Sequence, residues 1–204
     1  MITIVDYGLG NLGSVKNMLR HIGFQAVITG DPSLIAEAGC LILPGVGAFD
    51  NGMRHIKERG LLDILNRKAL VERVPVLGLC LGMQLMAEGS EEGSEPGLGW
   101  IGGRAVKFAA TGGLRIPHMG WNSVRIVNDC ALSRGFLPEM RFYFVHSYHV
   151  VCDDRRDVFL SAEYGGEIVA AVRRGNIMGT QFHPEKSHSF GMIVLRNFAE
   201  SADA

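Results

Sequence analysis

The first half of the sequence alternates short, mostly apolar runs with segments of helical periodicity. The apolar runs occupy residues 2–5, 40–43 and 74–80, and amphipathic stretches at 11–23 and 50–73 separate them. None of the runs alternates apolar with polar residues, which is typical of strands buried on both faces. We therefore predict an α/β fold with a central, mostly parallel sheet flanked by helices, the centre of the sheet lying in this half.

The second half is richer in short β segments separated by turn residues. From Trp100 onward the candidate strands are RAVKF, WNSVRIV, RFYFVHSYHV, VFLSAEY, EIVAAVRRG and NIMGTQFHPE. They predict a small antiparallel extension of the sheet or a second sheet. The last segment, 188–201, returns to a helical spacing of apolar residues, so we expect a C-terminal helix that packs back on the domain.

Composition limits the classes of protein to consider. With 204 residues, 47% of them hydrophobic, the chain suits one domain spanning 1–204 and would be cramped as two. With a formal net charge of -1, the chain has no excess of positive charge to attract nucleic acid or an anionic membrane surface, so neither is an expected partner. No stretch approaches the roughly 20 apolar residues of a membrane span, which indicates a cytoplasmic protein. The four cysteines lie far apart and indicate reduced thiols.

One cysteine, Cys80, occupies a pattern typical of a nucleophile. The segment Gly78-Leu79-Cys80-Leu81-Gly82 links an apolar run to a helical pattern, with glycines at the spacing of the GxSxG nucleophile elbow. At the start of a helix the thiolate would be favoured by the helix dipole, and the N–H of Leu81 would face a developing oxyanion. Considered alone, a buried structural cysteine remains the alternative.

The best candidate for a partner base lies far along the chain, in Thr180-Gln181-Phe182-His183-Pro184-Glu185. Pro184 favours an extended backbone at His183, and residues two apart in an extended chain face the same way, so Glu185 should lie beside the imidazole. Such a carboxylate orients the ring and stabilises the imidazolium that forms when it takes the thiol proton. The sequence therefore predicts a catalytic triad of Cys80, His183 and Glu185.

Two separated motifs, GLCLGMQL and QFHPE, closely resemble those of the class I glutamine amidotransferases, a family with a flavodoxin-like α/β fold. The segments DYGLGNLGS, LPGVGAFDNGM, PHMGWN and FYFVHSY are similar to the family of glutaminase subunits of imidazole glycerol phosphate synthase. The resemblance implies that Cys80 attacks the side-chain amide of L-glutamine, that His183 protonates the departing ammonia, and that water cleaves the γ-glutamyl thioester. It implies no cofactor.

The same resemblance implies roles for further residues. The oxyanion hole would be formed by Leu81, Val46 and Gly47. Glutamine would be bound by Gly45, Gln84, Glu92, His146, Ser147 and Tyr148. The implied partner is a (βα)8-barrel cyclase, which receives the ammonia through a protected channel in a heterodimer and makes imidazole glycerol phosphate and AICAR in histidine biosynthesis. The positions that match its interface are Asn11, Ser14, Trp121, Asn122 and Lys186.

Two of these positions carry physical arguments of their own. Trp121 is a plausible aromatic anchor for a partner, with an ordinary core aromatic as the alternative. The segment Pro44-Gly45-Val46-Gly47 departs from the PGG pattern of many other class I glutaminases. Because a valine after Gly45 restricts the backbone, we hypothesise that an oxyanion-donating N–H is turned away until the partner binds, leaving the isolated chain with low glutaminase activity.

Other interpretations compete with this one. The segment 8–13 satisfies the GxGxxG fingerprint of dinucleotide-binding oxidoreductases, with Asp31 about where a ribose-binding acid belongs, but that leaves the elbow cysteine unexplained. A regulatory subunit with vestigial glutaminase residues, a glutaminase that serves a different amination reaction, and a cysteine peptidase or related acyl-transfer hydrolase are further alternatives. A metal site is not expected, because His146 and His149 are three apart in an expected strand and would face opposite sides.

Overall fold

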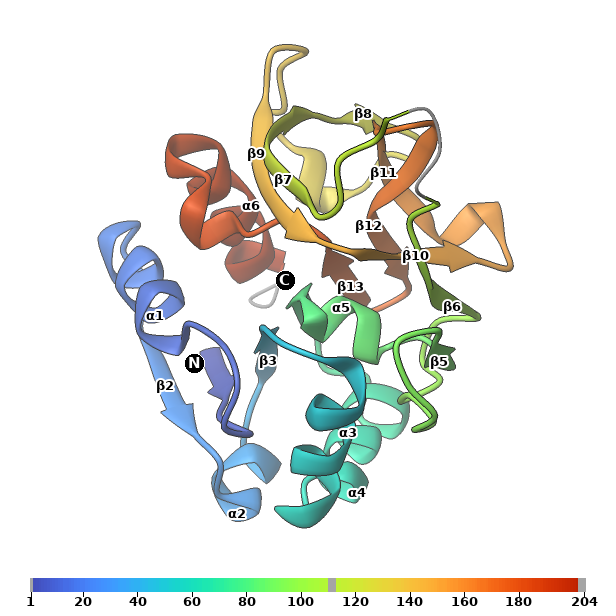
Figure 1. The fold of residues 1–204 in the computed structure, drawn as a ribbon. Helices are drawn as coiled ribbons and strands as arrows, with labels where there is room; N and C mark the ends of the chain where they lie inside the picture. The colour runs from blue at the N-terminus through green and yellow to red at the C-terminus, as the bar shows by residue number, and fades with distance from the viewer. Residues whose placement is uncertain (1, 110–112, 202–204) are drawn as a thin grey trace.

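The computed structural model describes residues 2–109 and 113–201, and its main element is an eight-stranded sheet of order β2-β1-β3-β4-β13-β12-β11-β8. The first five strands in that order run parallel. They are β2 (Ala26–Thr29), β1 (Ile2–Val5), β3 (Cys40–Gly45), β4 (Val76–Cys80) and β13 (Ile177–Thr180) (Figure 1). This is the strand order of the flavodoxin-like fold, as predicted.

The other three strands extend the sheet in antiparallel fashion, which confirms the predicted extension. They are β12 (Glu167–Arg174), β11 (Val158–Glu163) and β8 (Arg125–Ile126). The strand β13 was grouped with this extension from the sequence, and that grouping was wrong, since β13 pairs parallel with β4. Its four residues are all buried, which fits the middle of the sheet rather than an edge.

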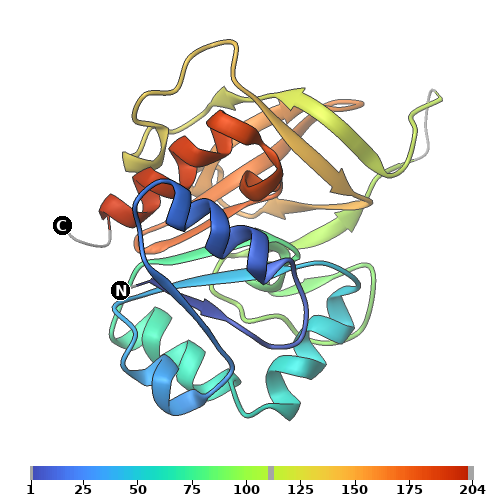
Figure 2. The ribbon, with the colours of Figure 1, turned by 90° about the vertical axis from the view of Figure 1, so that its left-hand side faces the viewer.

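Helices cover both faces of the sheet. One face carries α1 (Leu12–His21) and α6 (His188–Ser201), which lie side by side in Figure 2. The other carries α2 (Pro32–Ala36), α3 (Phe49–Glu58), α4 (Leu62–Asn66), a π-helical turn (Arg67–Val71) and α5 (Leu81–Leu85). Each helical layer encloses its own apolar cluster against the sheet. The amphipathic stretch 50–73 is therefore not one helix, because Gly60, with a φ of 66°, ends α3 before α4 begins.

Two smaller sheets lie beyond the carboxyl ends of the parallel strands. One has the order β10-β6-β5 (Tyr148–Cys152, Gly103–Lys107 and Gly89–Ser90), and the other pairs β7 (His118–Ser123) with β9 (Arg141–His146). The segment 141–150, expected as one strand, divides at Ser147 because its two parts pair with different partners. Short 3-10 turns occupy Ala131–Ser133, Arg155–Asp157 and Pro184–Lys186.

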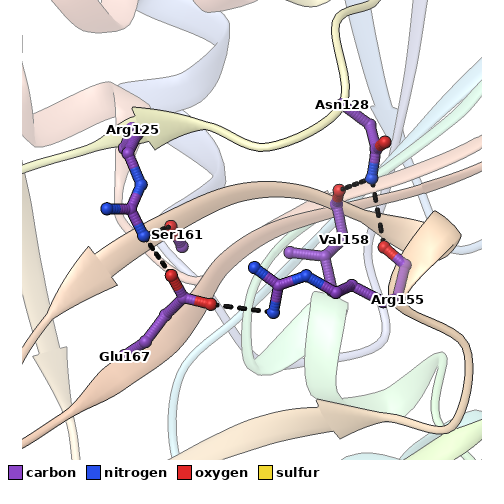
Figure 3. Close-up of polar contacts among 6 residues, drawn as sticks. All are labelled: Arg125, Asn128, Arg155, Val158, Ser161 and Glu167. Carbon is purple, nitrogen blue, oxygen red and sulfur yellow. Dashed lines mark hydrogen bonds and ion pairs between the residues drawn. The ribbon is translucent and has the colours of Figure 1, made fainter.

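The outer edge of the large sheet is held by a polar network (Figure 3). The carboxylate of Glu167 pairs with both Arg125 and Arg155. Beside them, the Asn128 side-chain amide donates hydrogen bonds to the carbonyls of Arg155 and Val158, at 3.1 and 2.8 Å. The arginines are largely exposed, so these pairs add little stability, but charged side chains on so short an edge strand disfavour pairing with another chain.

Candidate active site

The turn between β4 and α5 carries Cys80 in a strained backbone conformation, with φ 53° and ψ −107°. The flanking glycines are required by close packing. A Cβ on Gly82 would lie 1.7 Å from the carbonyl oxygen of Leu43, and one on Gly78 would lie 2.7 Å from that of Gly82. The predicted elbow geometry is therefore present. The Cys80 side chain stands at the carboxyl end of β4 and is 6% exposed.

The His183 imidazole lies against Glu185, with 2.8 Å between Nδ1 and Oε1, and both side chains are buried. The backbone at His183 is extended, as Pro184 was expected to impose. Glu185, however, reaches the ring from the 3-10 turn Pro184–Lys186 rather than from an extended strand, which corrects the geometric reason given above. Within the described residues His183 Nε2 has no hydrogen-bond partner, so this nitrogen is left available.

The environment of His183 favours the charged ring. Burial by itself lowers the pKa, but the interactions with Cys80 and Glu185 outweigh burial and raise the pKa of His183 to about 9. The imidazole is therefore protonated at neutral pH. A cation at this position stabilises a thiolate on Cys80, and an imidazolium can later give its proton to a leaving group.

A pair of buried glutamine side chains supports the sulfur. Gln181 Nε2 lies 3.8 Å from Cys80 Sγ, and Gln181 Oε1 accepts a hydrogen bond of 3.1 Å from Gln84 Nε2. Gln84 Nε2 also donates to the carbonyl of Tyr148 at 2.9 Å, so only its Oε1 remains for a ligand. Gln181 was not singled out from the sequence. Its position two residues before His183, on the same side of an extended chain, was the available signal.

A cavity of about 520 Å³ opens beside Cys80. Most of the residues expected around the substrate line it, together with two others that the sequence did not suggest, Pro117 and Val145. The expected residues in the lining are Val46, Gly47, Leu81, Gln84, Glu92, His146, Ser147, Tyr148, His183 and Lys186. Gly45 lies behind the wall: it is paired with Cys80 in the sheet, and a Cβ there would be 2.3 Å from the Tyr7 hydroxyl.

The acidic loop after α5, residues 90–99, is held in place by hydrogen bonds to α3. Glu92 Oε2 accepts a hydrogen bond of 2.8 Å from the backbone N–H of Phe49, at the start of α3, while Glu92 also lines the cavity. Asp50 in turn accepts from the backbone N–H groups of Ser94 and Glu95, at 3.0 Å each. The loop is thus fastened to α3, which fixes the carboxylate of Glu92 at the cavity wall.

The residues expected at a partner interface differ in their orientation. Trp121 is 45% exposed and stacks on His188 with ring centroids 5.4 Å apart, so it is not a core aromatic. Lys186 lines the cavity and lies 5.8 Å above the ring of Tyr143. Asn122, by contrast, turns its amide inward and donates to the carbonyl of Glu163 at 2.9 Å.

Two other expected interface residues lie on or beside α1. Asn11 is exposed and Ser14 is half-buried, and α1 packs beside the turn that carries Lys186. Met119, 62% exposed on the same strand as Trp121, is a further surface residue that the sequence did not suggest.

The glycine-rich segment that resembles a dinucleotide fingerprint has a structural role here. A Cβ on Gly8 would lie 2.8 Å from the guanidinium of Arg59, and Gly10 packs against the backbone of Pro44. The Asp31 carboxylate caps α2 by accepting from the N–H of Ser33 at 2.8 Å, so it does not serve as a free ribose-binding acid. Within residues 2–109 and 113–201, no group of three or more His, Cys, Asp or Glu side chains could hold a metal ion, and no helix is long and apolar enough to cross a membrane.

Comparisons with known proteins agree on one family. The model of the class I glutamine amidotransferases matches residues 3–202. The "Imidazole glycerol phosphate synthase subunit HisH 2" of Methanococcus maripaludis is 53% identical over 99% of this chain and 100% of its own. The protein of the same name in Pseudomonas aeruginosa is 48% identical over 98% and 99%.

Solved structures show the fold. A glutamine amidotransferase structure superposes with a TM-score of 0.77 at 21% identity over the full length of both chains. The structure of PurLQS from Thermotoga maritima superposes with a TM-score of 0.76 at 19% identity, covering 98% of this chain and 97% of that one. The chain is therefore a class I glutamine amidotransferase, and within that family it belongs with the HisH subunits of imidazole glycerol phosphate synthase.

Proposed function

We propose that this chain is the glutaminase subunit of an imidazole glycerol phosphate synthase, with Cys80, His183 and Glu185 as its catalytic residues. The observation that carries the proposal is the strained elbow cysteine beside a buried imidazole whose pKa is raised to about 9. Nucleophile, base and orienting carboxylate are the parts that thiol-dependent amide hydrolysis requires. Thiol, imidazole and water supply all the chemistry, so no cofactor enters the proposal.

The reaction proceeds through an acyl-enzyme. The Cys80 thiolate attacks the γ-carboxamide carbon of L-glutamine, and the negative charge moves to the amide oxygen. The N–H of Leu81 faces that oxygen, with a second donor from the segment Val46–Gly47. His183 Nε2–H gives its proton to the amide nitrogen, the C–N bond breaks, and ammonia leaves.

The second half-reaction restores the enzyme. His183, now neutral, takes a proton from water, and the resulting hydroxide attacks the γ-glutamyl thioester. The C–S bond breaks, glutamate forms, and the thiolate of Cys80 is again paired with the imidazolium. Glu185 holds the Nδ1–H side of the ring throughout, so that Nε2 always faces the reacting groups.

Substrate recognition uses the cavity wall. Both N–H groups of the Gln84 side-chain amide donate hydrogen bonds within the chain, so the amide oxygen is the atom left to bind the substrate. Glu92 has one oxygen fastened to Phe49 and the other left for the α-ammonium group of glutamine. The remaining expected binding residues in the wall are His146, Ser147 and Tyr148. Gly45 lies behind the wall and would act only by fixing the positions of its neighbours.

The partner we propose is a (βα)8-barrel cyclase that docks at the mouth of this cavity and takes the ammonia. Trp121, Lys186, Asn11 and Ser14 would contact it, and Asn122 would support the strand from inside. Relatives carry the word subunit in their names, which supports a partner of this kind. We place the heterodimer in the cytoplasm, with no nucleic acid or membrane as a partner.

One plate assay tests the proposal. Glutamate release from L-glutamine is measured for the chain and for Cys80→Ala, each with and without a cyclase subunit and its ribonucleotide ligand. We expect weak release alone, strong release in the complex, and none from the alanine variant. Release that survives Cys80→Ala would overturn the catalytic assignment. A rate of glutamate release that depends on Cys80 but is unchanged by the cyclase would favour the second candidate function, a glutaminase that serves another amination reaction.

A further inference from the structure

The strand β7 presents two different faces. Met119 and Trp121 are 62% and 45% exposed, whereas His118 is 3% exposed and Asn122 turns its amide inward. Successive residues of a strand point to opposite sides, so the outer face is free for a partner while the inner face packs on the smaller sheets. The inner face of β7 contacts β9, whose residue His146 lines the cavity.

On the inner face, two histidines form a buried hydrogen-bonded pair. His118 lies opposite His146 across the β7–β9 pairing, and His118 Nδ1 is 2.9 Å from His146 Nε2. His146 Nδ1 is 2.8 Å from the carbonyl oxygen of Tyr148. On the other side, His118 Nε2 is 3.2 Å from the Asn122 amide nitrogen. Every ring nitrogen of the pair is thus occupied.

Only one arrangement of protons satisfies these contacts. Burial lowers the pKa of His146 to about 3 and that of His118 to about 4, so both rings are neutral and each carries one N–H. The carbonyl of Tyr148 can only accept, so His146 must donate from Nδ1 and accept at Nε2. His118 must therefore donate from Nδ1 and accept from Asn122 at Nε2.

The chain of hydrogen bonds continues to the reactive sulfur. The carbonyl of Tyr148 accepts a second hydrogen bond, of 2.9 Å, from Gln84. Gln84 Nε2 donates to Gln181 at 3.1 Å, and Gln181 Nε2 faces Cys80 Sγ at 3.8 Å. The histidine pair is thus linked through the Tyr148 carbonyl to Gln84, Gln181 and the Cys80 sulfur.

We propose that His118 is a positioning residue for the glutaminase: by donating to His146 it fixes the tautomer that holds the Tyr148 carbonyl, and thereby the glutamine-binding wall beside Cys80. The proposal rests on the proposed function. Without the His118 donor, His146 Nε2 would be a buried acceptor with no donor, and the ring would gain by moving its proton to Nε2 or by rotating. Either change removes a hydrogen bond from Tyr148.

Two substitutions at His118 separate positioning from packing. His118→Phe keeps an aromatic ring against Phe144 and Tyr164, whose ring centroids lie 4.6 and 3.8 Å away, but has no donor. His118→Asn loses the ring but places an amide N–H near the position of Nδ1. We expect His118→Phe to raise the KM for glutamine by about 5- to 100-fold, the range for an unsatisfied buried polar group, with a smaller change in kcat. His118→Asn should recover most of that loss.

The matched control is His149→Phe. His149 is another partly buried histidine that stacks on Phe108, with ring centroids 4.7 Å apart, but it is outside the series of hydrogen bonds. This variant should leave KM within about 2-fold of wild type. All variants are assayed as the complex with the cyclase subunit, after circular dichroism has shown that they are folded.

A spectroscopic measurement on the unsubstituted chain keeps the proposal testable even if a variant fails to fold. Long-range 1H–15N NMR should show both His118 and His146 neutral and protonated at Nδ1. A proton on Nε2 of either ring, an unchanged KM in His118→Phe, or equal defects in His118→Phe and His118→Asn would overturn the positioning role. Those outcomes would leave the loss of glutamate release in Cys80→Ala untouched, so they are distinguishable from a failure of the glutaminase function itself.

Discussion

Glu185→Gln removes the charge that holds His183 while preserving the size of the side chain. The Nδ1 to Oε1 distance is 2.8 Å and the two side chains are only 2% and 3% exposed, so solvent screens the pair little. A hydrogen bond to a charged group contributes about 1.5–3 kcal/mol, and 1.36 kcal/mol corresponds to one pKa unit. The carboxylate favours the protonated ring, so at these energies its removal should bring the pKa of His183 down from about 9 to about 7–8.

The assay is the pH dependence of Cys80 alkylation by iodoacetamide, followed by mass spectrometry. In the wild-type chain the rate of alkylation should change near pH 9, where His183 loses its proton. In Glu185→Gln that step should move down to about pH 7–8, and glutamate release at pH 8 should fall. Glu200→Gln, at an exposed carboxylate paired with Arg134, is the isosteric control and should leave the profile unchanged. A Glu185→Gln profile that superposes on that of the wild type would refute the electrostatic role of Glu185.

Three further changes probe the elbow, the oxyanion segment and the surface. Gly82→Ala would place a Cβ 1.7 Å from the Leu43 carbonyl oxygen, so it should lower the free energy of unfolding, measured in urea, by about 3 kcal/mol. The control Gly39→Ala, whose Cβ would have no neighbour within 4 Å, should lower it by under about 1 kcal/mol. Val46→Gly should raise glutamate release by the isolated chain, up to the roughly 100-fold effect of one oxyanion donor; an unchanged rate would sink the gating hypothesis. Trp121→Ala should weaken cyclase binding by about 2 kcal/mol in calorimetry, and an unchanged Kd would place the interface elsewhere.

Three of the five parallel strands, β1, β3 and β4, could be predicted from the sequence because their signals are local, whereas β2 was not among the expected strands. Each apolar run is long enough and flanked clearly enough to be read as a buried strand, and α6 keeps its helical spacing to the end. The position of β13 could not be predicted, because which strand it pairs with depends on contacts with β4, some 100 residues earlier in the chain. The break at Ser147 was hidden for the same reason: nothing local distinguishes one strand from two that pair with different sheets.

In the candidate site, too, the residues with local sequence signals could be predicted and those defined by distant contacts could not. Cys80 and His183 could be identified because an elbow and a proline each restrict the backbone locally. Gln181 and His118 were missed, because an amide or an imidazole in a strand gains its significance only from the groups that the fold brings to it. The inward turn of Asn122, although its neighbour Trp121 faces outward, follows from strand alternation and could have been anticipated.

The central claim is that Cys80 carries the γ-glutamyl group during turnover. The most direct measurement is intact-mass and peptide mass spectrometry of the complex after glutamine is added and the reaction is stopped with acid within milliseconds. We expect a γ-glutamyl adduct on the peptide that contains Cys80, which decays as glutamate appears and is absent from Cys80→Ala. Turnover at the normal rate with no adduct at any time point, or an adduct on another residue, would contradict the account.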